Sequence, residues 1–120
     1  MSKVLIIDDS ATEVQLLKGI LEGAGYETIS ARSGEEGVAV AKAELPDVIL
    51  MDIVMPGLNG FQATRQLHKH DSTRAIPIIV VSTKSDETDR IWAMRQGATE
   101  YLVKPVEENA LVLAVNAAVG

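Results

Sequence analysis

Short runs of apolar residues alternate along the chain with longer stretches in which apolar residues recur at helical spacing. Three runs are apolar throughout, and two are weaker because they are mixed or short: 4–7, 48–51 and 78–81, then 27–30 and 101–103. Short apolar runs bounded by polar residues predict β-strands, and apolar residues repeated every three or four positions predict helices. The chain is therefore expected to alternate strand and helix five times.

Several of the predicted helices have clear ends. Ser10-Ala11-Thr12-Glu13 and Ser33-Gly34-Glu35-Glu36 both have the spacing of a capping box, which marks a helix N-terminus. Pro46 ends the second helix, and a shorter third helix is predicted from Phe61 to about Lys69. The apolar positions expected to face the core in the last two helices are Ile91, Met94 and Ala98, and then Leu111, Val115 and Ala118.

The strand runs also predict the order of the sheet. The runs that end at Ile7, Met51 and Val81 are apolar throughout, as central strands covered on both faces must be. The run 27–30 alternates polar and apolar residues and the run 101–103 is short, which is typical of edge strands. With right-handed crossovers the order becomes 2-1-3-4-5, a doubly wound α/β fold with a five-stranded parallel sheet and five helices.

Composition narrows the class of protein. With 120 residues, 47% of them hydrophobic, the chain is expected to form one domain over residues 1–120. It has no cysteine for disulfides or thiolate chemistry, and no apolar stretch long enough to span a membrane. Only three residues precede the first run, which leaves no room for a signal peptide, so a cytoplasmic location is expected. The net charge of −6 argues against binding nucleic acid.

Polar residues stand at the carboxyl ends of four of the predicted strands. Asp8 and Asp9 follow the first strand, Asp52 the third, Ser82 the fourth and Lys104 the fifth. Open parallel sheets bind their ligands at this edge, so these side chains are expected to form a site. A cluster of carboxylates accessible to water suits Mg²⁺, which prefers oxygen ligands and often accepts a phosphate oxygen.

This constellation predicts phosphoryl chemistry, in which a carboxylate is the nucleophile. The simplest alternative is an acidic cluster that only stabilises nearby helix N-termini. A second alternative is a phosphatase of the haloacid dehalogenase type, but such enzymes need an Asp two residues after the nucleophile, where this chain has Val54. A third is a flavodoxin-like cofactor carrier, but the pair Asp8-Asp9 would repel phosphate and no glycine-rich phosphate loop occurs.

Four segments together resemble the signature segments of response-regulator receiver domains. They are Val4-Leu5-Ile6-Ile7-Asp8-Asp9-Ser10, Asp52-Ile53-Val54-Met55-Pro56-Gly57-Leu58-Asn59-Gly60, Ser82-Thr83 and Lys104-Pro105. The resemblance covers essentially the whole chain and implies the flavodoxin-like (CheY-like) fold. It also implies a phosphorylation-dependent switch of a two-component or chemosensory system, which is not an enzyme.

The resemblance implies a role for each residue of the acidic cluster. Asp52 would accept a phosphoryl group from the phosphohistidine of a sensor histidine kinase. Asp9, Asp52 and the main-chain carbonyl of Val54 would bind Mg²⁺ directly, and Asp8 would act largely through water.

The remaining motif residues would form the switch. Ser82 and Lys104 would each contact a phosphoryl oxygen, and Tyr101, at the position of the switch aromatic, would turn inward as Ser82 moves. Pro105 would follow a cis peptide bond that directs Lys104. No receiver position that carries this chemistry is substituted in the sequence.

Two longer stretches, Asp52 to Leu67 and Asp86 to Val106, are similar to stand-alone receivers of chemosensory systems that drive type IV pilus twitching motility. Because no effector domain follows Gly120, the expected output is binding to a downstream protein, and the expected state is a monomer. Two alternatives stay open: a phosphate sink that competes for the kinase, and a chemotaxis regulator of flagellar motility.

Three further residues carry expectations about tuning and output. Val54 and Lys84 lie two residues after Asp52 and Ser82, at positions that flank the path of the attacking water in receivers. Neither Val nor Lys orients a water as Asn and Glu would, so slow self-dephosphorylation is expected. Trp92 lies just off the predicted core face of its helix, and it is either boundary packing or an anchor for a partner.

Overall fold

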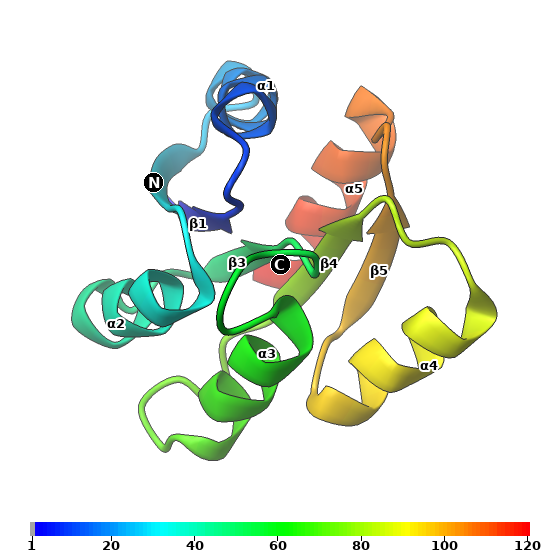
Figure 1. Cartoon of the computed structure of the whole chain (residues 1–120). Coiled ribbons are helices and arrows are strands. Elements are labelled where there is room, and N and C mark those ends of the chain that lie inside the picture. The colour runs from blue at the N-terminus through cyan, green and yellow to red at the C-terminus, as the bar shows by residue number, and fades with distance from the viewer. Residues whose placement is uncertain (1) are drawn as a thin grey trace.

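The chain folds into a parallel sheet that lies between two layers of helices (Figure 1). The computed structural model describes residues 2–120, which contain five strands: β1 Lys3–Ile7, β2 Glu27–Ala31, β3 Val48–Met51, β4 Ile78–Ser82 and β5 Glu100–Val103. Their order is β2-β1-β3-β4-β5, and every neighbouring pair is parallel. The predicted fold class and strand order are confirmed.

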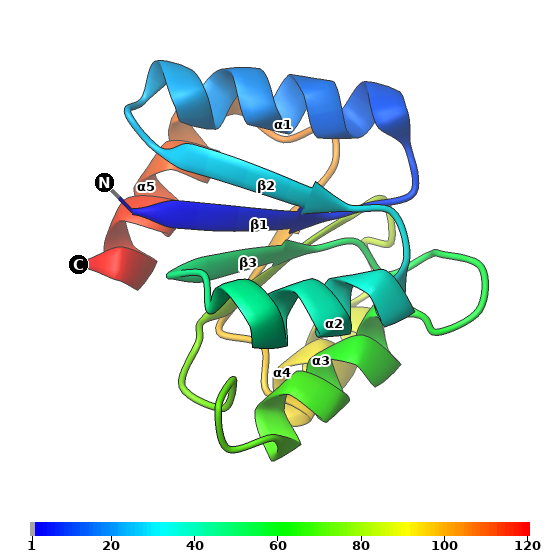
Figure 2. The same ribbon diagram turned by 90° about the vertical axis from the view of Figure 1, so that its left-hand side faces the viewer.

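Five helices connect and follow these strands within the described residues: α1 Ala11–Gly23, α2 Gly34–Glu44, α3 Gly60–Lys69, α4 Glu87–Gln96 and α5 Glu108–Val119. Helices α1 and α5 cover one face of the sheet, while α2, α3 and α4 cover the other (Figure 2). None of the described helices is long and apolar enough to cross a membrane.

Side chains of consecutive strand residues point to opposite faces, so one strand supplies both layers of the core. Val4 and Ile6 of β1 pack with α1 and α5, whereas Leu5 and Ile7 pack with α2 and α3. All four are at most 1% exposed. Full burial of such a side chain stabilises the fold by about 1.5–3 kcal/mol, which explains why the central strands lack polar residues.

The serine caps predicted from sequence are present at α1 and α2. Ser10 accepts a hydrogen bond from the Glu13 N–H at 3.2 Å, and Ser33 accepts one from the Glu36 N–H at 3.0 Å. The reciprocal half of both boxes differs from the pattern. The Ser10 N–H donates to the Asp8 carboxylate at 2.9 Å, and the Glu36 carboxylate accepts from the Arg32 N–H at 2.6 Å. These caps fix where each helix starts, and Ser10 directly follows the pair Asp8-Asp9 at the end of β1.

The predicted core face of the fourth helix was wrong at Ile91 and Met94 but correct at Ala98, which lies just after the end of α4. Ile91 and Met94 are 44% and 40% exposed, whereas Ala93 is only 1% exposed and packs with Ala98 and Tyr101. Because the one buried residue of α4 is the small Ala93, the larger apolar residues Ile91 and Met94 are left largely exposed. Leu111 and Val115 of α5 are fully buried, as predicted.

Candidate functional site

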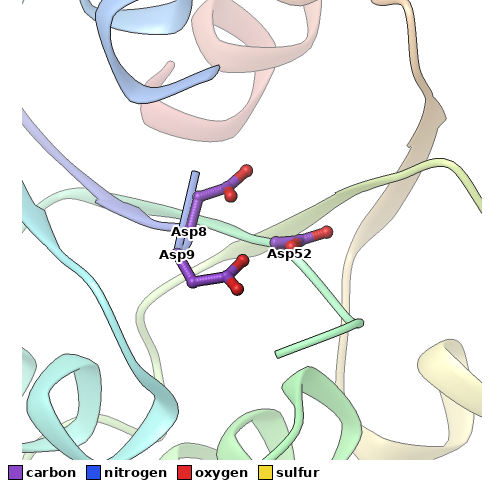
Figure 3. Close-up of side chains that lie close together, drawn as sticks. All are labelled: Asp8, Asp9 and Asp52. Atoms are coloured by element: carbon purple, nitrogen blue, oxygen red, sulfur yellow. The ribbon is translucent and has the colours of Figure 1, made fainter. Parts of the chain in front are cut away.

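Three carboxylates meet at the carboxyl edge of the sheet. Asp8 and Asp9 directly follow β1 and Asp52 directly follows β3, its neighbour in the sheet (Figure 3). The pairing of Ile7 with Met51 brings these strand ends level, and the Asp52 N–H donates to the Ile7 carbonyl at 2.9 Å. One oxygen from each of the three carboxylates lies within 4.8 Å of the others. Asp8 and Asp52 are buried, while Asp9 faces solvent.

Lys104 is the cation that the structure places against this cluster. Its ammonium lies 2.8 Å from the Asp8 carboxylate and 3.5 Å from that of Asp52. The Lys104 main-chain N–H donates to the Ser82 carbonyl at 2.8 Å, which aligns the end of β5 with the end of β4. The peptide bond between Lys104 and Pro105 is cis, as the resemblance implied.

The acidic cluster carries more negative charge than Lys104 can balance. Burial and the neighbouring charge of Asp8 raise the pKa of the Asp52 carboxyl to about 6, although Lys104 acts in the opposite direction. Burial alone would lower the pKa of Lys104, but its bond to Asp8 and the charges of Asp52 and Asp8 raise that pKa above its ordinary value. An all-oxygen donor set with surplus negative charge and access to water suits a divalent hard cation, so the residues present fit Mg²⁺.

Ser82 and Tyr101 lie beside the cluster and are joined through the main chain of Lys84. Ser82 is the last residue of β4 and is fully buried, and its hydroxyl accepts from the Lys84 N–H at 3.2 Å. The Tyr101 hydroxyl donates to the Lys84 carbonyl at 2.7 Å, and the residue is only 5% exposed. The predicted switch aromatic thus already occupies the inward position in this structure.

The residues expected to tune the site lie at its rim. Val54 is 59% exposed in the loop that follows Asp52. The ammonium of Lys84, whose direction was open at the level of sequence, lies 3.8 Å from the Asp89 carboxylate in the first turn of α4. Trp92 is 49% exposed on the outer side of α4, so it does not serve as core packing.

Sequence reasoning missed two residues that hold the loops of the site. The Glu35 carboxylate at the start of α2 accepts from the Leu58 N–H at 3.2 Å, which ties down the loop after Asp52. Asp89 is the partner of Lys84 described above. Both contacts join segments with no shared sequence pattern. The only available signal was the opposite charge of Lys84 and Asp89 five positions apart.

Comparisons with known proteins agree with the class of protein that the parallel sheet and the acidic cluster at its carboxyl edge indicate. Residues 4–116 match the response regulator receiver domain family, so the chain belongs to this family and is a receiver domain of two-component signalling. It is 56% identical over 117 residues to protein PilH of Pseudomonas aeruginosa, an alignment that covers 98% of this chain and 97% of PilH.

Solved structures are similarly close. A response regulator from Chloroflexus aurantiacus superposes with a TM-score of 0.94 at 34% identity, covering 98% of this chain and 97% of that one. The receiver domain of a sensor histidine kinase from Pseudomonas aeruginosa has a TM-score of 0.92 at 27% identity, covering 99% and 98% of the two chains. That structure has a magnesium ion coordinated in its active-site cleft.

Proposed function

We propose that this protein is a phosphorylation switch that accepts a phosphoryl group on Asp52 from the phosphohistidine of a sensor histidine kinase. The observation that carries the proposal is the setting of Asp52, which is buried at the strand edge beside Asp8 and lies 3.5 Å from the ammonium of Lys104. Asp52 directly follows the central strand β3, and the loop after it exposes Val54, Pro56 and Gly57.

In the proposed reaction, a carboxylate oxygen of Asp52 attacks the phosphorus, the bond from phosphorus to the histidine nitrogen breaks, and an aspartyl phosphate remains. Lys104 holds the carboxylate in place and then pairs with a phosphoryl oxygen, and the Ser82 hydroxyl donates to another. Asp9, Asp52 and the Val54 carbonyl, with Asp8 nearby, would hold Mg²⁺, which would supply positive charge to the phosphoryl oxygens. Tyr101 and Lys84 transmit the change at Ser82 toward α4.

The proposed output is altered binding to a downstream protein in the cytoplasm, by a monomer that contacts neither nucleic acid nor membrane. Control of type IV pilus twitching motility is the proposed process, and its support is the 56% identity to PilH over nearly the full length of both chains. The exposed Trp92, Ile91 and Met94 on α4 give this output a candidate contact surface.

Small phosphodonors test the acceptor directly. With Mg²⁺, acetyl phosphate is expected to modify Asp52 alone, because the neighbouring Asp8 is tied to Lys104 at 2.8 Å. Asp52→Asn should abolish labelling, whereas Lys104→Ala should keep partial labelling with a weaker change in Trp92 fluorescence. Peptide mapping by mass spectrometry is the measurement. Phosphate found on another residue would overturn the assignment.

Magnesium should stabilise the folded protein, since the cation relieves repulsion that exists only in the folded state. For an assumed dissociation constant of about 1 mM, 10 mM Mg²⁺ adds about 1.4 kcal/mol to the free energy of unfolding, a rise in Tm of several degrees. Differential scanning fluorimetry in EDTA and in Mg²⁺ measures the shift, with Asp9→Asn as the variant expected to lose most of it. A titration without a shift in the native protein would contradict the metal site.

A further inference from the structure

The main chain of Lys84 lies beside the proposed phosphoryl site, but its ammonium lies next to α4. Its main-chain N–H bonds to the Ser82 hydroxyl at 3.2 Å, and its carbonyl accepts from Tyr101 at 2.7 Å. Its ammonium, however, lies 3.8 Å from the carboxylate of Asp89. The backbone of Lys84 therefore belongs to the site, while its side chain is directed toward α4.

Asp89 is well placed to hold that ammonium. Its side chain is only 18% exposed, against 43% for the side chain of Lys84. The charge of Asp89 also acts on Tyr101: burial is the main reason that the pKa of Tyr101 is raised, and the charge of Asp89 is the next. A carboxylate so restricted loses little conformational entropy in pairing, which favours an ion pair that exposed side chains would form only weakly.

Without Asp89, the proposed site is a second anionic partner toward which the Lys84 ammonium can turn. Three carboxylates converge there with Lys104 as their salt-bridge partner, and a phosphoryl group would add further negative charge. The four-carbon stem of a lysine is flexible, and its compact ammonium pairs readily with phosphoryl oxygens. The Lys84 side chain can therefore pair either with Asp89 or with the phosphoryl group at the proposed site.

We propose that Asp89 is a positioning residue that holds the Lys84 ammonium away from the phosphoryl group and so sets how fast the aspartyl phosphate decays. This inference rests on the proposed function. In the decay, a water oxygen attacks phosphorus, the bond from phosphorus to the Asp52 oxygen breaks, and the water proton passes to solvent, leaving inorganic phosphate. An ammonium on the phosphoryl oxygens covers the approach of that water, so a released Lys84 slows the reaction.

A double-mutant cycle on the phosphorylated protein tests this role. The protein is labelled with acetyl phosphate and Mg²⁺, the donor is removed, and the remaining aspartyl phosphate is followed with time. Asp89→Asn should lengthen the half-life about threefold, and Lys84→Met should stay within about twofold of the native protein. In the double variant the effect of Asp89→Asn should disappear, because no ammonium is left to release.

Two further variants separate positioning from a general effect on the fold. Asp86→Asn removes a carboxylate from the same turn, where Asp86 is exposed and makes no side-chain capping bond, and it should leave the half-life unchanged. Asp89→Glu keeps the charge and should restore decay to within about twofold of the native rate.

The outcomes distinguish this inference from the function on which it rests. Equal slowing by Asp89→Asn with and without Lys84, or no slowing at all, overturns the role of Asp89 while the phosphorylation switch stands. If the native protein takes no label on Asp52, both proposals fail together. Should Asp89→Asn unfold, the Asp89→Glu and Lys84→Met half-lives still decide, because a change in either beyond twofold contradicts the assigned geometry.

Discussion

Asp52→Asn is expected to raise the free energy of unfolding, in the absence of metal, by roughly 3 kcal/mol at about pH 7.5 but by only about 1 kcal/mol at about pH 4.5. Folding raises the pKa of the Asp52 carboxyl from 3.8 to about 6, chiefly through burial and then through the charge of Asp8. Between these two values the folded protein keeps a proton that the unfolded chain releases. The native protein therefore loses stability as the pH rises through this window, and asparagine, which does not ionise, removes the loss.

Chemical denaturation of both proteins in EDTA at the two pH values measures this difference. Asp86→Asn is a matched control, since Asp86 is exposed and lies outside the acidic cluster. The growth of the difference with pH is decisive, because a change in packing at residue 52 would shift both measurements equally. A stability gain that is the same at both pH values would show that Asp52 is not held in an unfavourable ionised state.

This expected instability has a functional meaning. An ionised Asp52 buried beside Asp8 destabilises the folded protein. A cation, or in the proposed switch a phosphoryl group with its metal, would relieve this repulsion, and the free energy released would help to order the site. Lys104 compensates only in part, since its ammonium is closer to Asp8 than to Asp52, at 2.8 Å against 3.5 Å. Magnesium and Asp52→Asn should therefore both stabilise the folded protein by relieving the same repulsion, so their effects on the free energy of unfolding should not add.

Much of the architecture could be predicted from sequence because two physical rules act strongly in this chain. Doubly covered strands must be apolar throughout, so the run Ile78-Ile79-Val80-Val81 marks a central strand without ambiguity. Parallel strands end at one edge, so Asp8 and Asp52 had to meet once β1 and β3 were neighbours. Neither inference required knowledge of any side-chain contact.

The errors arose where the outcome depends on how elements pack rather than on periodicity. In α4, Ile91 and Met94 have helical spacing, but the helix packs through Ala93, and a sequence alone does not show which of two faces is buried. The pairing of Lys84 with Asp89 likewise depends on the path of the loop after β4. Long side chains with several rotamers are the part of the site that pattern reasoning cannot place.

The structure also bears on the lifetime predicted from Val54 and Lys84. Val54 is 59% exposed at the rim of the site, where its branched side chain has no group that could orient a water for in-line attack. Lys84 is held by Asp89 at 3.8 Å and offers no carboxylate for that purpose either. Slow self-dephosphorylation is therefore still expected, and it would suit a persistent signal better than a phosphate sink that competes for a shared kinase.

The double change Val54→Asn with Lys84→Glu should speed decay of the phosphorylated protein by about tenfold, which needs only about 1.4 kcal/mol off the barrier. Asparagine at residue 54 can hydrogen-bond the attacking water. A glutamate at residue 84 is repelled by Asp89, which directs its carboxylate away from α4 and toward the same water.

Loss of label after removal of the phosphodonor measures this rate, and each single variant shows how the gain is divided. Lys84→Met in place of Lys84→Glu is the matched control, because it removes the ammonium without adding a group that can orient water. It should bring little acceleration when combined with Val54→Asn. If the double variant with glutamate decays at the native rate, these two side chains do not set the lifetime. A phosphate sink that competes for the kinase is then no longer disfavoured.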